Sequence, residues 1–268
     1  MKNKILLLTL VALPLGSCKN TQEKKESEKM DIYLLLGQSN MAGRGILDST
    51  ELCLDKIYVF NKNDKWEEAK EPIHFDKPMA GTCLATSFAI EVQRVSNNKV
   101  GLIPCAVGGT SINHWHPNIL DSITNVRPYN QAVSRTQKAL KKGRLKGILW
   151  HQGEGDSANE GYITYESKFN QLLMNLSNDL HIDIDTIPVI VGELGTFFTA
   201  QANRKNAYRI DSVLRKIAEK KINLYCVSSS GLTHKGDSTH FDTESLRELG
   251  KRYAEGYNIV LKREKKHY

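Results

Sequence analysis

The sequence predicts an α/β protein, a three-layer α/β/α sandwich built around a five-stranded parallel sheet. Two observations carry this prediction. Short apolar runs alternate along the chain with longer segments in which apolar residues recur at helical spacing. The apolar runs are also nearly continuous and do not alternate with polar residues, which is typical of strands that have helices on both faces of the sheet.

The expected elements begin shortly after residue 30. Strands are expected at Ile32–Leu36, Val100–Val107, Leu145–His151, Ile187–Leu194 and Ile222–Val227. Helices are expected at Thr86–Val95, Tyr129–Lys142, Tyr162–Leu180, Gln201–Lys220 and Glu244–Lys262. The long segment Leu47–Cys83 is irregular, and we expect it to hold loops at the rim of the sheet and a short hairpin, with Ile57–Phe60 as its clearest strand. No repeat or internal linker divides the chain, so one domain is expected over residues 31–268.

The first residues have the features of an export signal. Lys2 and Lys4 precede an apolar run, Ile5–Leu15, that is too short to cross a bilayer as a helix. The run closes on Leu-Gly-Ser-Cys at residues 15–18, which resembles the lipobox of bacterial lipoproteins, whose cleavage leaves a lipid-bearing cysteine at the new N-terminus. Residues 1–17 are therefore expected to be a lipoprotein signal peptide, with Cys18 as the lipidated residue. The alternative is an ordinary signal peptide followed by an incidental cysteine.

Residues 18–30 are expected to form a flexible tether. The segment is rich in Lys and Glu and has too few apolar side chains to fold by itself. The protein is therefore expected to be exported and held at a membrane through an N-terminal lipid anchor, in the periplasm or at the cell surface. The tether would let the folded body reach polymer outside the bilayer.

The overall composition, with 40% hydrophobic and 25% charged residues, is that of an ordinary globular protein. The formal net charge is +7, and part of the excess lies in the C-terminal segment Lys262–Lys266. These basic residues are not interleaved with aromatic ones, so we expect no nucleic-acid partner. The chain is expected to act as a monomer.

Four cysteines follow Cys18. Cys105 and Cys226 lie in apolar, strand-like runs and are expected to be buried thiols. Cys53 and Cys83 lie in less regular sequence and could pair in an oxidising compartment, which the sequence leaves open.

Polar, glycine-rich clusters follow four of the expected strands. They span residues 37–45, 108–115, 152–156 and 234–240. Because the carboxyl ends of parallel strands share one edge of the sheet, these clusters should meet there, at the edge where open α/β sheets bind ligands. This arrangement predicts an active site.

Three of the clustered residues have the chemistry of an acyl-transfer triad. Ser39 follows a strand, with glycines on both sides that would expose its hydroxyl. His240 would act as its base, and Asp237, three residues earlier, would orient the imidazole and stabilise its charged form. The alternatives are that Ser39 is a helix N-cap and that His240 is a surface histidine.

An acyl-transfer site also needs donors for the developing oxyanion. The backbone N–H groups of Ser39 and Gly109 and the side-chain amide of Gln152 are the candidates, with Gly108 as the alternative to Gly109. Residues 37–41, Gly-Gln-Ser-Asn-Met, do not fit the G-x-S-x-G elbow, which argues against an α/β-hydrolase.

The four motifs together resemble those of SGNH hydrolases, specifically carbohydrate esterase family 6 and sialate O-acetylesterase domains. They read GQSNMAG at residues 37–43, GGTSI with Trp115 at residues 108–115, WHQGE at residues 150–154, and D-x-x-H at residues 237–240. The resemblance implies a flavodoxin-like three-layer fold and hydrolysis of O-acetyl esters on sugars without a metal or other cofactor. It also implies Ser39 as nucleophile, Asp237 and His240 as the acid–base pair, and Ser39, Gly109 and Gln152 as oxyanion donors.

Other residues near the motifs are expected either to support the site from behind or to contact substrate: Gln38, Asn40, Glu154 and Trp115. Glu154 is expected to hold a loop by accepting backbone N–H bonds, although a catalytic role is the alternative. Trp115 is either a wall against which a sugar stacks or a core aromatic residue.

Two further points concern charge and metal. Arg44 is expected to pair with a structural acid, the alternative being a bond to the carboxylate of an acidic sugar. The pairs His114 with His116 and His151 with Glu154 lack a third ligand at a usual spacing, so no zinc site is expected.

The sequence therefore predicts a serine esterase that removes O-acetyl groups from carbohydrate through an acyl-enzyme. The alternatives are a broader small-acyl esterase or lipase of the same superfamily and a non-catalytic glycan-binding lipoprotein. Acetylxylan, acetylated sialic acid and similar glycans are not distinguished.

Overall fold

The computed structural model describes residues 29–47, 52–158 and 160–265. It contains one seven-stranded sheet in the order β3-β2-β4-β1-β5-β6-β7. The strands are β1 (Met30–Gly37), β2 (Ile57–Phe60), β3 (Trp66–Glu68), β4 (Val100–Pro104), β5 (Gly143–His151), β6 (Val189–Gly192) and β7 (Leu224–Val227). The expected signal peptide, Cys18 and most of the expected tether lie outside the described residues. Met30, expected to end the tether, is instead the buried first residue of β1.

The predicted parallel strands correspond to β1, β4, β5, β6 and β7, and all their pairings are parallel. The prediction of five strands was nevertheless two short. The expected hairpin joins the same sheet, because β2 pairs parallel with β4 and antiparallel with β3. Ile57, Val59 and Phe60 are buried, so β2 extends the core where only a rim hairpin was expected.

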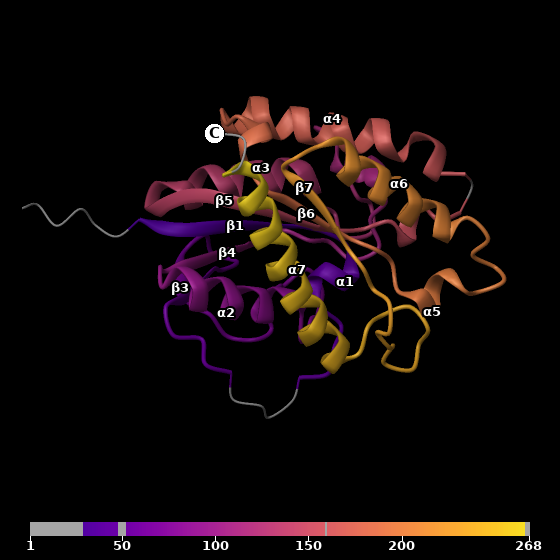
Figure 1. Ribbon diagram of the computed structural model, residues 1–268, viewed down its shortest axis with the longest axis horizontal. Helices are drawn as coiled ribbons and strands as arrows, with labels where there is room; N and C mark the ends of the chain where they lie inside the picture. Colours follow the sequence, from indigo (N-terminus) through magenta and orange to yellow (C-terminus); the bar gives the residue numbers. More distant parts are fainter. Residues whose placement is uncertain (1–28, 48–51, 159, 266–268) are drawn as a thin grey trace, which may run out of the picture.

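Helices cover both faces of the sheet (Figure 1). One face is covered by α2 (Leu84–Ser96) and α7 (Thr243–Glu264), which pack on each other. The other is covered by α3 (Pro128–Ala139), α4 (Tyr162–Leu180) and α6 (Ala207–Lys220). This is the predicted three-layer α/β/α sandwich. Two one-turn helices, α1 (Ser39–Ala42) and α5 (Thr196–Thr199), lie beyond the carboxyl ends of β1 and β6.

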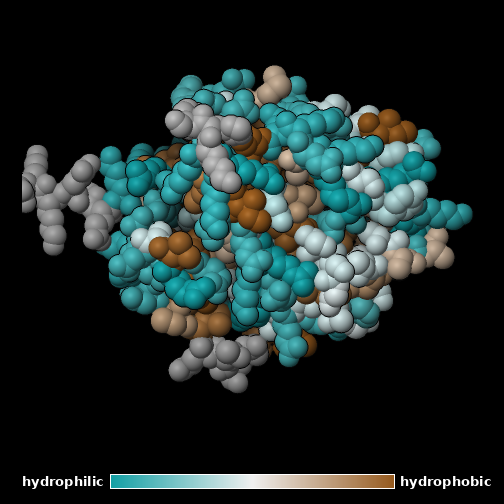
Figure 2. Space-filling view, in the orientation of Figure 1, coloured by the Kyte–Doolittle hydropathy of each residue, from teal (hydrophilic) through white to brown (hydrophobic). Residues whose placement is uncertain are grey.

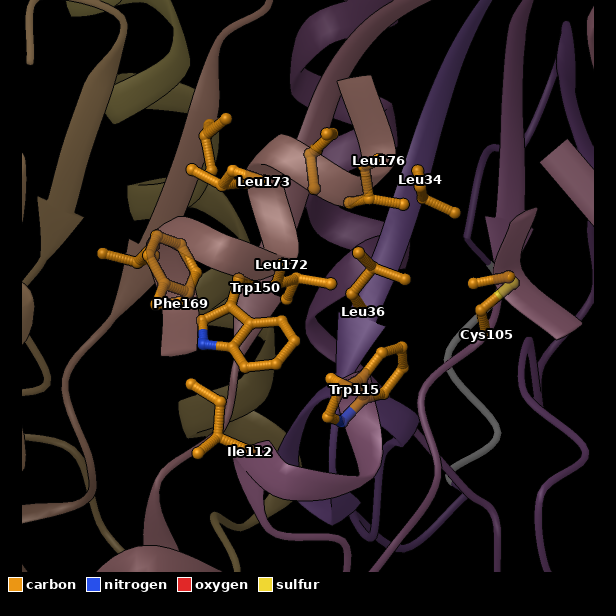
Figure 3. Close-up of a cluster of buried hydrophobic side chains, with 14 of the residues drawn as sticks. Leu34, Leu36, Cys105, Ile112, Trp115, Trp150, Phe169, Leu172, Leu173 and Leu176 are labelled. Atoms are coloured by element: carbon orange, nitrogen blue, oxygen red, sulfur yellow. The ribbon is translucent and has the colours of Figure 1, made fainter. Parts of the chain in front are cut away.

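The central strand explains why its sequence is apolar throughout. In β1, Leu34 and Leu36 point into the core under α3, α4 and α6 (Figure 3), whereas Tyr33 and Leu35 point into the core under α2 and α7. Both sets are almost completely buried. The continuous apolar run therefore serves two cores, as expected for a covered parallel strand.

The outer surface is polar by comparison. On the face of Figure 2, hydrophilic side chains predominate and hydrophobic ones are scattered. Within the described part of the chain, no helix is both long and apolar enough to span a membrane. Cys53, Cys83, Cys105 and Cys226 are all free thiols, so the pairing left open for Cys53 and Cys83 is not formed.

One helix begins later than predicted. The pattern indicated a helix from Gln201, but α6 begins at Ala207 and turns occupy residues 202–206. Asn203 and Asn206 lie within this stretch, and asparagine favours turns because its side chain competes for backbone hydrogen bonds. The difference is relevant to the site, because these turns carry Arg204 to its edge.

Candidate active site

The site lies where the strand order reverses, beyond the carboxyl ends of β1 and its neighbours β4 and β5. This is the position at which open α/β sheets bind ligands. A cavity of about 500 Å³ opens there, and Ser39, Gly109, Glu154, Arg204 and His240 are among the residues that line it. The loops after β1, β4, β5 and β7 thus meet at one edge, as the polar clusters predicted.

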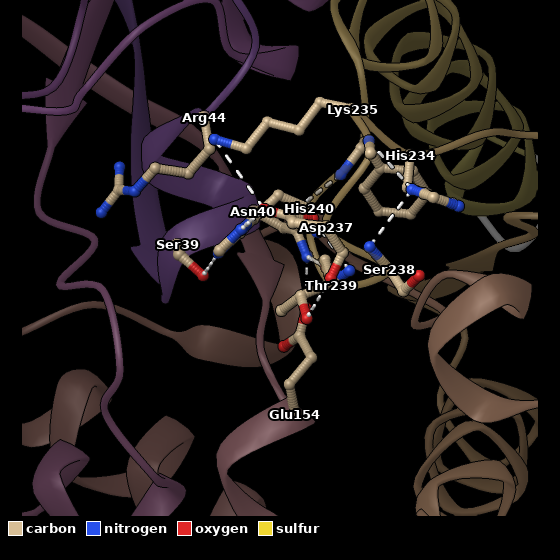
Figure 4. Close-up of polar contacts among 12 residues, drawn as sticks. Ser39, Asn40, Arg44, Glu154, His234, Lys235, Asp237, Ser238, Thr239 and His240 are labelled. Carbon is tan, nitrogen blue, oxygen red and sulfur yellow. Dashed lines mark hydrogen bonds and ion pairs between the residues drawn. The ribbon is translucent and has the colours of Figure 1, made fainter. Parts of the chain in front are cut away.

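The three predicted triad residues are in contact (Figure 4). The Oγ atom of Ser39 lies 2.9 Å from Nε2 of His240. On the other side of the ring, Nδ1 lies 2.7 Å from Oδ2 of Asp237. This chain of contacts runs from hydroxyl to imidazole to carboxylate, which is the geometry required to remove a proton from a serine hydroxyl.

Asp237 is fixed by its own loop. Its Oδ1 accepts hydrogen bonds from the backbone N–H groups of His240, at 2.8 Å, and Thr239, at 3.0 Å. Burial raises the pKa of the Asp237 carboxyl, but the bonds from the His240 backbone and ring and from Thr239 outweigh it and bring the pKa to about 2. Asp237 is therefore a carboxylate at any pH where His240 could act as a base.

The turn that carries Ser39 depends on a close approach of two backbones. Gly37 has φ 130°, and a Cβ atom there would lie 2.1 Å from the carbonyl oxygen of His151. The Gln38 N–H donates to that same oxygen, at 3.0 Å, which ties the turn to β5. Gln38 is the N-cap of α1 and Ser39 its first residue, so the N-cap alternative for Ser39 is wrong. The serine side chain is thus left for His240.

The loop after β4 has two backbone N–H groups near the cavity that differ in their partners. Gly108 N–H donates to Oδ2 of Asp76, at 2.9 Å, and is therefore occupied. Gly109 has φ 90° and lines the cavity, and in the described part of the chain no group accepts a hydrogen bond from its N–H. The geometry favours Gly109 over Gly108 as the available donor.

A buried ion pair joins this loop to the turn that carries Ser39. Arg44 Nη2 lies 2.6 Å from Asp76 Oδ2, and the two side chains are 4% and 2% exposed. The other end of the guanidinium, Nη1, donates to the carbonyl oxygen of Gly43 at 2.7 Å. Arg44 therefore pairs with a structural acid, as expected, and that acid also holds Gly108.

The comparisons with known proteins identify the family. A model of carbohydrate esterases described as sialic acid-specific acetylesterases matches residues 29–258. The chain belongs to this family. It is also similar to a probable carbohydrate esterase of Arabidopsis thaliana, with 30% identity over 90% of this chain and 97% of the relative. The family's members are carbohydrate acetylesterases, so the protein is a carboxylic ester hydrolase and the predicted resemblance is confirmed.

Solved structures agree on the fold of this esterase. The Arabidopsis structure has a TM-score of 0.74 and 28% identity over 86% of this chain and 98% of its own. NanS matches with a TM-score of 0.68 and 17% identity, covering 88% of this chain and 98% of its own. A carbohydrate acetylesterase from Xanthomonas citri matches with a TM-score of 0.61 and 17% identity, covering 86% of this chain and 56% of its own. At 17% identity these last two bear on the fold alone.

The prediction for Gln152 is wrong in this esterase. Its side chain is fully buried and does not line the cavity. The amide nitrogen lies 2.6 Å from Asp156 Oδ2 and 3.1 Å from both Gln38 Oε1 and the Thr110 carbonyl oxygen. Its two hydrogens are therefore used inside the protein. Gln152 holds the loops after β4 and β5 together instead of facing an oxyanion.

Gln38 and Asn40 support the site from within. Gln38 Oε1 accepts from Gln152 and, at 3.2 Å, from the Gly155 N–H. Asn40 is 1% exposed; its amide donates to Glu154 Oε1 and to the Thr239 carbonyl oxygen, and its oxygen accepts from the Phe241 N–H. Asn40 thereby connects the turn that carries Ser39 to the loop that carries His240.

Trp115 does not form a sugar-binding wall. It is fully buried under the sheet, packed edge-to-face on Trp150 with ring centroids 5.4 Å apart (Figure 3). Its Nε1 donates to Thr110 Oγ1 at 3.3 Å. Trp115 is therefore a core aromatic residue, which was the alternative expectation, and it anchors the loop after β4 to the hydrophobic core.

Glu154 differs from its expected role. It was expected to hold a loop through backbone N–H groups, but its Oε1 instead accepts from the Asn40 side chain, at 2.5 Å. Its Oε2 is buried and has no hydrogen-bond partner among the residues that the structure describes, although Glu154 itself lines the cavity. Burial raises the pKa of this carboxyl.

Several residues at the site were missed. Asp76 and Lys77 come from the irregular segment before α2, and Arg204 comes from the turns before α6. The Lys77 ammonium lies 3.7 Å from the position that a Cβ on Gly109 would take. No periodicity or motif marks these charges, so only the fold could bring them to the site. Among the described residues, no group of three His, Cys, Asp or Glu side chains could hold a metal ion.

Proposed function

We propose that the protein hydrolyses O-acetyl esters of carbohydrate, with Ser39, His240 and Asp237 as its catalytic triad. The observation that carries the proposal is the continuous contact from Ser39 Oγ through the His240 ring to Asp237 at the wall of the cavity. Membership of the carbohydrate acetylesterase family supplies the class of bond.

The proposed reaction has two halves. His240 Nε2 takes the hydroxyl proton of Ser39 as Oγ attacks the acetyl carbonyl, and the oxyanion faces the N–H groups of Gly109 and Ser39. The tetrahedral species collapses, the sugar oxygen leaves with the proton held by His240, and an acetyl-serine remains. Water, deprotonated by His240, then attacks that ester and releases acetate and free Ser39.

The cavity is consistent with a small acyl group. Most of the residues that line it are polar or charged, and the large hydrophobic side chains among them are Met79 and Phe198. A long acyl chain would need a continuous apolar channel, which these two side chains do not provide. The enzyme is therefore expected to prefer acetate to longer acids.

The test is acyl-chain preference together with acetate release. Protein from residue 29 onward should hydrolyse p-nitrophenyl acetate much faster than the octanoate, release acetate from acetylated glycans, and keep its activity in EDTA. A preference for octanoate would favour the broader esterase or lipase. Loss of activity in EDTA, or no hydrolysis at all, would contradict the proposed triad chemistry.

We also propose that Cys18 carries a lipid that holds the enzyme at a membrane. Support comes from the sequence alone: the apolar run Ile5–Leu15 ends at a lipobox-like Leu-Gly-Ser-Cys. Several acyl chains anchor a protein far more firmly than one. Cys18→Ala should move the protein from the membrane fraction to the soluble fraction with its esterase activity retained. A wild-type protein that is soluble and free of acyl chains by mass spectrometry would contradict this proposal.

A further inference from the structure

Two residues that line the cavity each have a buried polar atom with no hydrogen-bond partner in the part of the chain that the structure describes. One atom is Oε2 of Glu154, a residue that is 6% exposed, and the other is Nε of Arg204. Both residues line the cavity that contains Ser39 and His240. An unpaired buried donor or acceptor is destabilising, and more so when the group is charged, so a ligand that satisfied both atoms would gain affinity there.

Both side chains are held in place by contacts on their other sides. The second carboxylate oxygen of Glu154 accepts the amide of Asn40. The Arg204 guanidinium lies over the ring of Phe198, with its central carbon 4.7 Å from the ring centroid, and Phe198 is itself buried. These contacts restrict both side chains, and a restricted side chain loses less conformational entropy when a ligand binds.

The combination of groups selects the ligand's chemistry. Arg204 Nε–H donates only, whereas a carboxylate accepts only, so the matching group must accept from one and donate to the other. A hydroxyl does both. A ligand carboxylate would meet Glu154, and a ligand ammonium would meet Arg204, so each is opposed by a like charge.

We propose that Arg204 and Glu154 form a subsite that binds a free hydroxyl of the sugar carrying the acetyl ester. This inference rests on the proposed function, since the sugar is the leaving group at Ser39. Burial raises the pKa of Glu154, and the nearby Asp156 adds to this effect, while hydrogen bonds from Asn40 and from the Glu154 backbone N–H and the charge of Arg204 lower it. The hydroxyl donates to the Glu154 carboxylate and accepts from the Arg204 Nε–H.

The test is Arg204→Met, assayed on two substrates. Acetylated xylo-oligosaccharides carry free hydroxyls, and p-nitrophenyl acetate carries none. Loss of a hydrogen bond to a charged group should lower kcat/KM on the oligosaccharide, relative to p-nitrophenyl acetate, about 10- to 100-fold. The loss should appear mainly in KM, because the subsite binds the sugar in ground state and transition state alike.

Arg209→Met is the matched control. Arg209 is also stacked on aromatic rings, Tyr162 and Tyr208, but it is exposed and does not line the cavity. Its loss should leave the ratio of the two activities as in the wild type. Glu154→Gln keeps an oxygen for Asn40 but replaces the acceptor Oε2 with an amide donor, so it should lower the same ratio while the protein stays folded by circular dichroism.

The outcomes separate the subsite from the proposed function. If the wild type hydrolyses both substrates and Arg204→Met leaves their ratio unchanged, the subsite is wrong while the triad stands. If Arg204→Met impairs only hydrolysis of an O-acetylated sialic acid, Arg204 binds a carboxylate and the hydroxyl assignment is overturned. A wild-type enzyme inactive on every ester would overturn both.

Discussion

Removal of the Asp76 carboxylate should affect both stability and catalysis. In Asp76→Ala, Arg44 would lose its partner at 2.6 Å and the Gly108 N–H its acceptor at 2.9 Å. Because the Arg44 and Asp76 side chains are only 4% and 2% exposed, solvent cannot replace these contacts. The remaining guanidinium would then be a buried, uncompensated charge.

The magnitude follows from this burial. Breaking a buried pair by removing one partner typically costs about 3–5 kcal/mol, a large part of the roughly 5–15 kcal/mol by which a domain is stable. The next N–H in the loop, that of Gly109, should also lose its orientation. An oxyanion donor contributes about 10²–10³ to kcat, so a loss of kcat by up to about 10²-fold is expected where the variant is still folded.

The assay is urea unfolding followed by p-nitrophenyl acetate hydrolysis under conditions where the variant is folded. Asp64→Ala is the control, because Asp64 pairs with Arg135, a side chain 5% exposed, away from the cavity. It should destabilise the protein with kcat unchanged. Asp76→Asn should recover part of kcat, because its side-chain oxygen can still accept from Gly108. A folded Asp76→Ala enzyme with wild-type kcat would refute the reasoning.

Other predictions test neighbouring parts of the account. Asp237→Asn should lower kcat about 10³–10⁴-fold with little change in stability, since the amide favours the wrong tautomer of His240; wild-type kcat would assign that role elsewhere. Gln152→Ala should lower the free energy of unfolding by several kcal/mol, because it leaves buried acceptors unpaired; wild-type stability with a large loss of kcat would instead restore Gln152 as an oxyanion donor. In His74→Leu, urea unfolding should show a smaller loss of unfolding free energy between pH 6.5 and pH 4 than in the wild type, by about the contribution of one proton that binds only to the unfolded chain. A loss as large as that of the wild type would contradict this prediction.

The sign for His74 follows from its environment. Burial lowers the pKa of His74 to about 3, against 6.5 for an ordinary histidine, and neither ring nitrogen has a partner. Between these values the unfolded chain binds a proton that the folded protein does not. The contribution of neutral His74 to the free energy of unfolding is therefore fully present above pH 6.5. It is lost as the pH falls toward 3, because the unfolded chain takes up the proton first. Leucine has no proton to bind and leaves no hydrogen bond unmade.

The fold could be predicted because its signal is local. A strand buried on both faces must be apolar at every position, and the run around Leu34 and Leu36 meets that requirement. The same runs place the following glycine-rich turns at one edge of the sheet, which is why Ser39 and His240 could be brought together from sequence. The place of β2 in the sheet could not, because a four-residue strand carries no information on its partner.

The errors share a physical cause: the direction of a side chain. Gln152 follows β5 as predicted, but Gln38 and Asp156 take its amide hydrogens. Trp115 follows the Gly109 loop as predicted, yet its ring packs on the core.

Asp76 and Arg204 were missed for a different reason. They come from irregular segments, where burial and charge pairing are set only after the chain has folded.

The most direct test of the central claim is acetate release by Ser39→Ala. Alanine removes the Oγ atom that lies 2.9 Å from His240 and leaves the backbone donors of the site in place. Turnover of p-nitrophenyl acetate and of acetylated glycan should both fall by at least about 10³-fold, with the thermal unfolding temperature close to that of the wild type. A stable Ser39→Ala protein that still releases acetate at the wild-type rate would show that another group attacks the ester.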